Sequence, residues 1–176
     1  MGVMAIRPIL LHPDPRLKAV AEPIGEITDA THRLAADLLE TMYVAPGIGL
    51  AAPQVGVARR LLVMDCIKDE DAEPQPMVLI NPAVTWASEE LGTYEEGCLS
   101  IPEHFAEIER PAEVDIIWTG LDGSQFSKRF DRIWSTCVQH EIDHLNGKLF
   151  IDYLKPLKRQ MITRKMVKLK REQARV

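Results

Sequence analysis

Two histidines that stand four residues apart, in the stretch Gln139–His144, are the residues whose types and spacing most clearly carry chemistry. Residues i and i+4 of a helix lie on the same face, so the imidazoles of His140 and His144 can bind one metal ion together. Glu141 follows the first histidine, and its carboxylate can act on a water bound to that ion. An amphipathic helix whose histidines only pack or face solvent shows the same short pattern, so the other residues must decide.

A catalytic metal site of this type needs a third protein ligand and one position left open for water. One class of metallopeptidase has a third histidine six residues after the second, but here that position is Phe150. Another class uses a downstream glutamate, but no acidic residue lies between Asp152 and Glu172. We therefore expect the third ligand to come from upstream of His140.

Cys137 and Cys98 are the upstream candidates. Cys137 lies one helical turn before His140 and about 10 Å along the helix axis from His144, too far for its short side chain to share the ion. We expect Cys137 to line the pocket beside the metal or to be a small buried residue. Cys98 follows Gly97 and has polar neighbours, as expected in a bend, and a cysteine thiolate is a common metal ligand. Cys98 is therefore the predicted third ligand.

The remaining cysteine, Cys66, ends an apolar run and is expected in the core. Three cysteines cannot all pair, which argues against a disulfide framework and favours a reducing cytoplasm. No apolar run approaches the length of a membrane span, and residues 1–11 lack the basic leader of a signal peptide. We therefore expect a cytoplasmic protein that has neither a membrane nor DNA as a partner.

Helical patterns flank a central region of short strands. Apolar residues recur at helical spacing over residues 28–43, Asp131 can cap the helix that carries the histidines, and Gly147 is a typical helix stop. Asn81 and Pro82 are expected to bend one strand. The apolar runs predict strands over residues 60–66, 77–86, 106–108, 114–119 and 125–130.

Strands clustered between helices favour an α+β fold. We expect short, mostly antiparallel strands that surround a central metal-binding helix, with an N-terminal helix and a C-terminal helix at about residues 156–174. The 176 residues, of which 46% are hydrophobic and 27% charged, predict one soluble globular catalytic domain over residues 1–176.

Three segments together resemble the three ordered motifs of the peptide deformylase family. They are Gly47–Gln54 (GIGLAAPQ), Glu96–Ser100 (EGCLS) and Gln139–His144 (QHEIDH). The order and spacing of the motifs and the length of the chain are similar to those of the family, and Cys98 fills the ligand position left vacant above. The C-terminal segment resembles the bacterial subtype that ends in a helix.

The resemblance implies that the chain removes the formyl group from the N-terminal formyl-methionine of new polypeptides. It implies one divalent ion, iron(II) as the native metal, with zinc, nickel or cobalt able to replace it. Metal-bound water would attack the formyl carbonyl with Glu141 as general base and then acid, while the Gln54 amide and the Leu99 backbone N–H stabilise the oxyanion. The residues expected to bind the formyl-methionyl peptide are Gly47, Ile48, Gly49, Glu96, Gly97, Ile133 and Cys137.

The C-terminal segment is strongly basic, with nine Lys or Arg and one acidic residue from Lys155 to Val176. Its net charge of +8, within a total of −5, leaves −13 for residues 1–154. A solvated basic helix face explains this asymmetry, and the resemblance also implies docking on the ribosome. Two rival interpretations of the metal site remain, a peptidase and a closed structural site in which His104 or another histidine is a fourth ligand.

Overall fold

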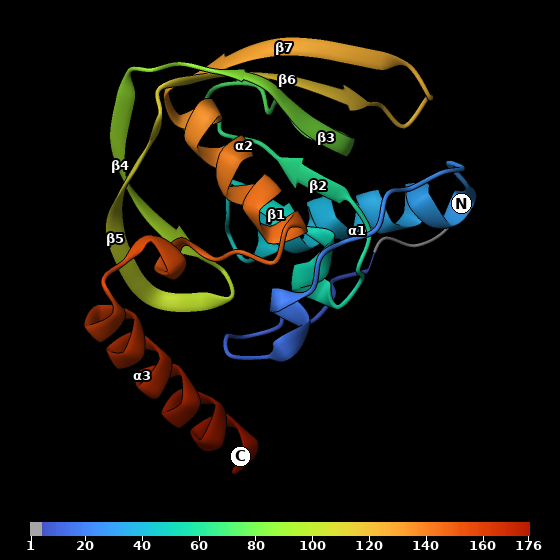
Figure 1. Cartoon of the computed structure of the whole chain (residues 1–176). Coiled ribbons are helices and arrows are strands. Elements are labelled where there is room, and N and C mark those ends of the chain that lie inside the picture. Colours follow the sequence, from blue (N-terminus) through green and yellow to red (C-terminus); the bar gives the residue numbers. More distant parts are fainter. Residues whose placement is uncertain (1–4) are drawn as a thin grey trace.

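The computed structural model describes residues 5–176, which form an α+β fold with helices at both ends (Figure 1). Residues 1–4 of the predicted domain lie outside the described part. The α-helices are α1 (Asp29–Val44), α2 (Arg132–Leu145) and α3 (Pro156–Ala174). The strands are β1 (Gly49–Ala51), β2 (Leu61–Met64), β3 (Met77–Ala87), β4 (Leu91–Cys98), β5 (Ile101–Pro111), β6 (Glu113–Thr119) and β7 (Gln125–Asp131). Short 3₁₀-helices cover Pro15–Lys18, Ala52–Val55 and Phe150–Tyr153.

The strands form two antiparallel sheets that enclose α2, as Figure 1 shows. The five-stranded sheet has the order β1-β2-β3-β6-β7, and β4 pairs with β5 in a separate two-stranded sheet. Helix α2 contacts strands of both sheets. The predicted arrangement of antiparallel strands around a central helix is therefore confirmed.

Helix α2 is held by its apolar side. Val138, Ile142 and Leu145 are buried in one cluster with side chains of the five-stranded sheet, among them Ile116 and Phe130. Burying side chains of this size contributes about 1.5–3 kcal/mol each, which fixes the rotation of the helix about its axis. The histidines and Asp143 consequently face β4 and β5, where their contacts lie.

Two strands were not predicted, and the reason lies in their composition. β1 has three residues, and two of them are the small residues Gly49 and Ala51. β4 is largely polar and partly exposed, so it lacks the apolar alternation of a half-buried strand. Cys98 was expected in a bend but is the last residue of β4, and the turn starts at Leu99. The register with β5 shifts just before it, between Gly97 and Cys98. The expected bend at Asn81 is confirmed by a register shift in β3 and a φ of 51°.

Gly147 ends α2 as predicted, two residues after Leu145. Its φ of +74° lies in the left-handed region, which glycine adopts at little cost. A Cβ atom at this position would also overlap the backbone carbonyl of Lys18. Glycine is therefore required here both for its conformation and for the close approach of the N-terminal segment.

We expect Gly147→Ala to lower the free energy of unfolding by about 2–4 kcal/mol, because a left-handed conformation and a steric overlap both oppose the methyl group. Gly123→Ala is the matched control. Gly123 has a φ of +84°, but a Cβ there would meet no atom within 4 Å, so the expected loss is about 1 kcal/mol. Urea unfolding of both variants measures the difference. Equal losses in the two variants would contradict the proposed overlap with Lys18.

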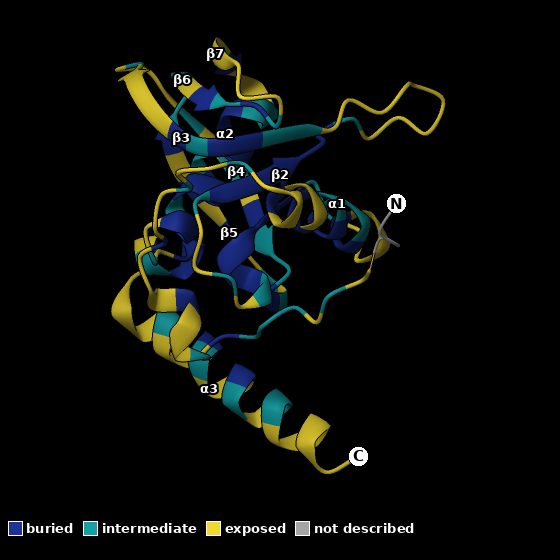
Figure 2. Cartoon of the chain, turned by 90° about the vertical axis from the view of Figure 1, so that its right-hand side faces the viewer, coloured by how far each residue is buried: buried dark blue, intermediate teal, exposed yellow. Residues whose placement is uncertain are grey.

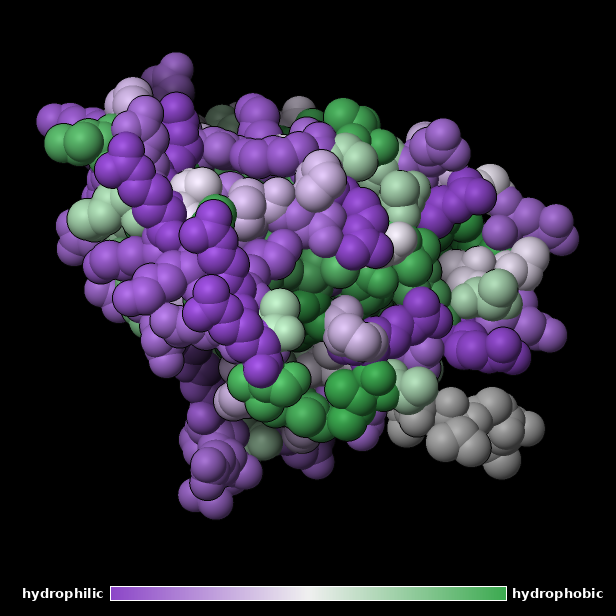
Figure 3. Space-filling model, turned by 90° about the horizontal axis from the view of Figure 1, so that it is seen from below, coloured by the Kyte–Doolittle hydropathy of each residue, from purple (hydrophilic) through white to green (hydrophobic). Residues whose placement is uncertain are grey.

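Helix α3 packs along the outside of the molecule through one narrow face (Figure 2). Ile162 and Met166 are buried against a cluster that includes Leu17 and Phe150. Most other side chains of α3 are exposed or half-buried, and hydrophilic side chains predominate on this side of the molecule, around an apolar region (Figure 3). The helix bounds agree with the predicted 156–174. Within residues 5–176, no helix has both the length and the apolar character that crossing a membrane requires.

Candidate metal centre and active site

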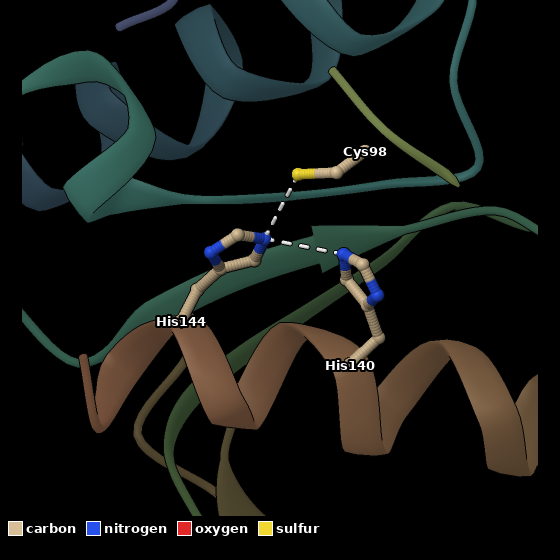
Figure 4. Close-up of side chains that lie close together, drawn as sticks. All are labelled: Cys98, His140 and His144. Atoms are coloured by element: carbon tan, nitrogen blue, oxygen red, sulfur yellow. Dashed lines mark hydrogen bonds between the residues drawn. The ribbon is translucent and has the colours of Figure 1, made fainter. Parts of the chain in front are cut away.

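The side chains of Cys98, His140 and His144 converge on one point (Figure 4). The Nε2 atom of His144 lies 3.2 Å from the Nε2 atom of His140 and 3.4 Å from the Sγ atom of Cys98. The three donor atoms all lie within 4.8 Å of one another. One sulfur and two imidazole nitrogens so close together fit a single divalent transition-metal ion. The end of β4 and one face of α2 thus bring the three predicted ligands together.

The environment of these ligands suits metal binding. Both histidines are buried. Burial lowers the pKa of His144 well below its usual value, which favours the neutral imidazole that a cation requires. The pKa of His140 is raised well above its usual value despite burial, because Cys98, Glu96 and Glu141 stabilise its charged form, and a bound cation would replace that proton.

Cys137 lies outside the ligand group in the described chain. The neighbouring Cys66 thiol and burial raise the pKa of the Cys137 thiol, and this thiol donates a hydrogen bond to the backbone carbonyl of Ile48. Both favour the protonated form, which is a poor metal ligand.

Glu141 lies beside this group on α2 and is itself buried. Burial raises the pKa of its carboxyl group to about 7, helped by the negative charge of Glu96. Its Oε2 atom is buried and makes no hydrogen bond with any residue of the described chain. A buried carboxylate with one free oxygen beside a cation site has the geometry of a proton acceptor.

A cleft of about 730 Å³ opens over these residues. Two of the ligands, Cys98 and His140, line it, whereas His144 lies behind them. The cleft is also lined by every residue expected to act on or bind the substrate: Gly47, Ile48, Gly49, Gln54, Glu96, Gly97, Leu99, Ile133, Cys137 and Glu141. The structure brings the predicted residues to one cleft, while their individual roles stay predictions.

Gln54 is held in a fixed orientation at the base of the cleft. Its side-chain oxygen accepts a hydrogen bond from the backbone N–H of Ala51 at 3.0 Å, which fixes which end of the amide is the donor. Its Nε2 atom donates to the Ser100 hydroxyl at 3.1 Å and lies 3.6 Å from the Cys98 sulfur. The donor end of this amide therefore points toward the metal ligands.

The glycines of the first motif allow the walls of the cleft to come close to one another. A Cβ atom on Gly49 would lie 2.7 Å from Oε1 of Glu141 and 2.9 Å from the Cys137 sulfur. A Cβ atom on Gly47 would lie 2.9 Å from the Leu99 side chain. Only glycine lets the backbone pass so near the carboxylate of Glu141.

Glu96 borders the cleft, but its carboxylate points away from the open space. It accepts two hydrogen bonds from Arg110, at 2.7 and 2.9 Å, and lies 2.9 Å from Nδ1 of His140. The bonds from Arg110 and His140 lower the pKa of Glu96 despite its burial. These contacts occupy the side chain of Glu96, so its expected contact with substrate stays a prediction.

Arg110 is the residue that sequence reasoning missed. Its side chain is 5% exposed, and it carries no recognisable motif. One signal was available, because Ala106, Ile108 and Arg110 alternate along β5 and all three are buried. The alternation puts Arg110 on the inner face of the strand, where a charged side chain requires a partner.

The rival interpretation of a closed structural site requires a fourth protein ligand. His104 lines the rim of the cleft and does not belong to the ligand group of the described residues, which has three members. A set of three protein ligands that opens onto a cleft is typical of catalytic metal sites, whereas structural sites have four.

Comparisons with known proteins support this interpretation. Residues 6–160 match the family model described as polypeptide deformylase. A peptide deformylase of Acinetobacter baumannii (strain SDF) is 51% identical over 172 residues, which cover 98% of this chain and 96% of that protein. The crystal structure of a Legionella pneumophila peptide deformylase is 42% identical and superimposes with a TM-score of 0.89, covering 98% of this chain and 99% of that one.

A further solved structure, a class I type b peptide deformylase of A. baumannii with Met-Ala-Ser bound, is 30% identical. Its TM-score is 0.82, and the match covers 86% of this chain and 100% of that one. The family model, the relatives and the fold agree over nearly the whole chain, and the three ligands occupy one open site. The chain belongs to the polypeptide deformylase family.

Proposed function

We propose that the chain hydrolyses the formamide bond of N-terminal formyl-methionine in newly made polypeptides. The observation that carries this proposal is the convergence of Cys98, His140 and His144 beside Glu141 in one open cleft. We also propose that the whole chain, residues 1–176, acts as a single catalytic domain.

Cys98, His140 and His144 are the residues that would hold the metal. A divalent ion in such a site supplies Lewis acidity and lowers the pKa of a bound water. Glu141 takes a proton from the attacking water and then donates one to the departing amine. Burial favours both steps, because a carboxyl group with a pKa near 7 can accept and release a proton at neutral pH.

The attack turns the formyl oxygen into an oxyanion, which needs hydrogen-bond donors. The Nε2 group of Gln54 and the backbone N–H of Leu99 are the proposed donors. The fixed orientation of the Gln54 amide supports this role, since it needs no rearrangement during the reaction. Losing one donor of this kind typically costs about 3 kcal/mol, or about 100-fold in rate.

The substrate is proposed to bind in an extended conformation along β1. This strand is at the edge of the five-stranded sheet, so one side of it is free of strand partners within the described chain. A peptide backbone can pair with such an edge. The apolar side chains of Ile48 and Ile133, with Cys137, would receive the methionine side chain, and the Met-Ala-Ser complex of the A. baumannii relative supports a ligand of this kind.

Hydrolysis of formyl-Met-Ala-Ser, compared with a blocked peptide that offers only internal amide bonds, tests this proposal against the peptidase alternative. We expect release of formate from the first peptide and no cleavage of the second. Cleavage of the internal bonds, with formyl-Met-Ala-Ser left intact, would show that the site serves a peptidase.

We propose iron(II) as the native metal, with zinc, nickel or cobalt able to replace it. The thiolate of Cys98 supports a softer transition metal, and its sulfur is open to oxidation. Metal analysis of protein purified without oxygen measures the ion, and activity in air then compares iron with zinc. Equal, air-stable rates with both metals would contradict the choice of iron.

We propose that the enzyme works in the cytoplasm, where new chains emerge, and that α3 docks on the ribosome. The basic side chains on the outer face of α3 support contact with RNA phosphates. Phosphate contacts release counterions, so co-sedimentation with ribosomes is expected to fall steeply between 50 and 200 mM salt. Replacing the exposed Lys158 and Lys165 with Glu should abolish it, and unchanged co-sedimentation of this folded variant would overturn the docking.

A further inference from the structure

One buried guanidinium connects the two elements that carry the metal ligands. Arg110 donates two hydrogen bonds to Glu96, which stands two residues before Cys98 on β4. It donates a third bond, at 2.8 Å, to Asp143, which directly precedes His144 on α2. The strand that carries the thiolate and the helix that carries the imidazoles are therefore joined through one side chain.

The same contacts determine which nitrogen of His140 faces the metal. Oε1 of Glu96 lies 2.9 Å from Nδ1 of His140, and an ionised carboxylate can only accept a hydrogen bond. The proton of the imidazole is thus held on Nδ1, and the lone pair of Nε2 is left for a cation. Arg110 keeps Glu96 in this position, because its guanidinium bonds both carboxylate oxygens. The carboxylate cannot rotate without losing one of these two bonds.

Tyr153 completes the network from the other side. Its hydroxyl donates to Oδ2 of Asp143 at 2.7 Å, and its ring lies 4.9 Å from the Arg110 guanidinium carbon. Tyr153 is half-exposed and ends the short helix that leads to α3. The connection from Tyr153 through Asp143, Arg110 and Glu96 to His140 thus runs from the surface to the ligands.

We infer that Arg110 and Tyr153 are positioning residues that hold Cys98, His140 and His144 in the arrangement a metal needs. Stability alone does not account for such a network, since replacing a buried ion pair with apolar residues is often neutral. A fixed distance between β4 and α2 and a fixed imidazole tautomer are properties that a metal site uses directly. This inference rests on the proposed metal site and deepens it.

Zinc-loaded protein allows a test that does not depend on activity. The rate of zinc transfer to a chromogenic chelator reports how firmly the ligand set is held. The proton signal of Nδ1 of His140 in NMR spectra reports the tautomer, and a thermal melt of each variant reports folding. Arg110→Lys keeps the charge but loses the two-point contact, and Tyr153→Phe keeps the ring but loses the hydroxyl.

We expect Arg110→Lys to release zinc about 10- to 100-fold faster and to shift or broaden the Nδ1 proton signal. Tyr153→Phe should release zinc about fivefold faster, as the loss of one hydrogen bond implies. Arg129→Lys is the matched control, because Arg129 makes the same two-point contact with Asp115, at 2.7 and 2.9 Å, on the exposed sheet surface. Its release rate should stay within about twofold of wild type.

Wild-type release rates and an unchanged proton signal in folded Arg110→Lys and Tyr153→Phe proteins would overturn the inference. If Arg110→Lys does not fold, Tyr153→Phe decides in the same way. If the proposed metal site itself is wrong, the wild-type protein will not bind one zinc ion per chain, which is a different result. The two failures are therefore distinguishable from the same set of measurements.

Discussion

Replacing Glu141 with Gln is expected to lower kcat/KM for a formyl-methionyl peptide by about 100- to 10,000-fold. The two side chains have nearly the same shape, so packing against Gly49 should be unchanged. The amide cannot accept the proton of the attacking water, which is the step assigned to this carboxylate. Steady-state kinetics on protein with a defined metal content measures the effect.

Metal content and folding serve as controls for Glu141→Gln, because Glu141 is not one of the three ligands. One ion per chain and an unchanged melting temperature are expected in the variant. A rate within tenfold of wild type at full metal content would show that another group moves the proton. Loss of the ion together with the rate would instead show that Glu141 helps to hold the metal.

Replacing Cys98 with Ala is expected to weaken metal binding by more than about 100-fold and to abolish deformylation. Two imidazoles from one helix would remain, and the loss of a direct ligand should exceed the 10- to 100-fold typical of its hydrogen-bonding neighbours. Cys66→Ala is the control, since Cys66 is also a free thiol but lies outside the ligand group. A Cys98→Ala protein that keeps one tightly bound ion would contradict the assignment.

The sequence predicted the site better than the strands around it. His140 and His144 could be placed on one face because the helical period is regular, and Cys98 followed from what the downstream residues lack. The predicted helices agree closely with α1, α2 and α3 because apolar spacing and helix stops such as Gly147 are local signals. β4 was not predicted because its side chains are largely polar. Its backbone hydrogen bonds are made with β5, and no local sequence pattern reveals this pairing.

The role of Arg110 could not be predicted for a related reason. Its partners Glu96 and Asp143 lie 14 and 33 residues away in the chain, on different elements. Alternation along β5 indicates only that Arg110 points inward. The role of Arg110 can be recognised only when β4 and α2 are packed against each other, since its guanidinium then contacts a residue next to or near each metal ligand.

Helix α3 has a buried face that anchors it to the core and a basic outer face that is proposed to dock on the ribosome. Ile162 and Met166 anchor it to the core, so the basic outer face is displayed in a fixed orientation. His12 adds a 2.8 Å contact with Thr163, which joins the N-terminal segment to the same helix. For this reason charge-reversing substitutions on the exposed face are a cleaner test of docking than removal of the helix, which would uncover the apolar cluster beneath it.

We propose that the three ligands hold a metal on which removal of the formyl group depends. The most direct measurement is formate release from formyl-Met-Ala-Ser by protein that has been stripped with a chelator and then reloaded with one equivalent of iron(II) without oxygen. We predict that stripping abolishes formate release and that one ion per chain restores it. Full activity in the stripped protein, or no activity in the reloaded protein with the ion bound, would contradict the claim.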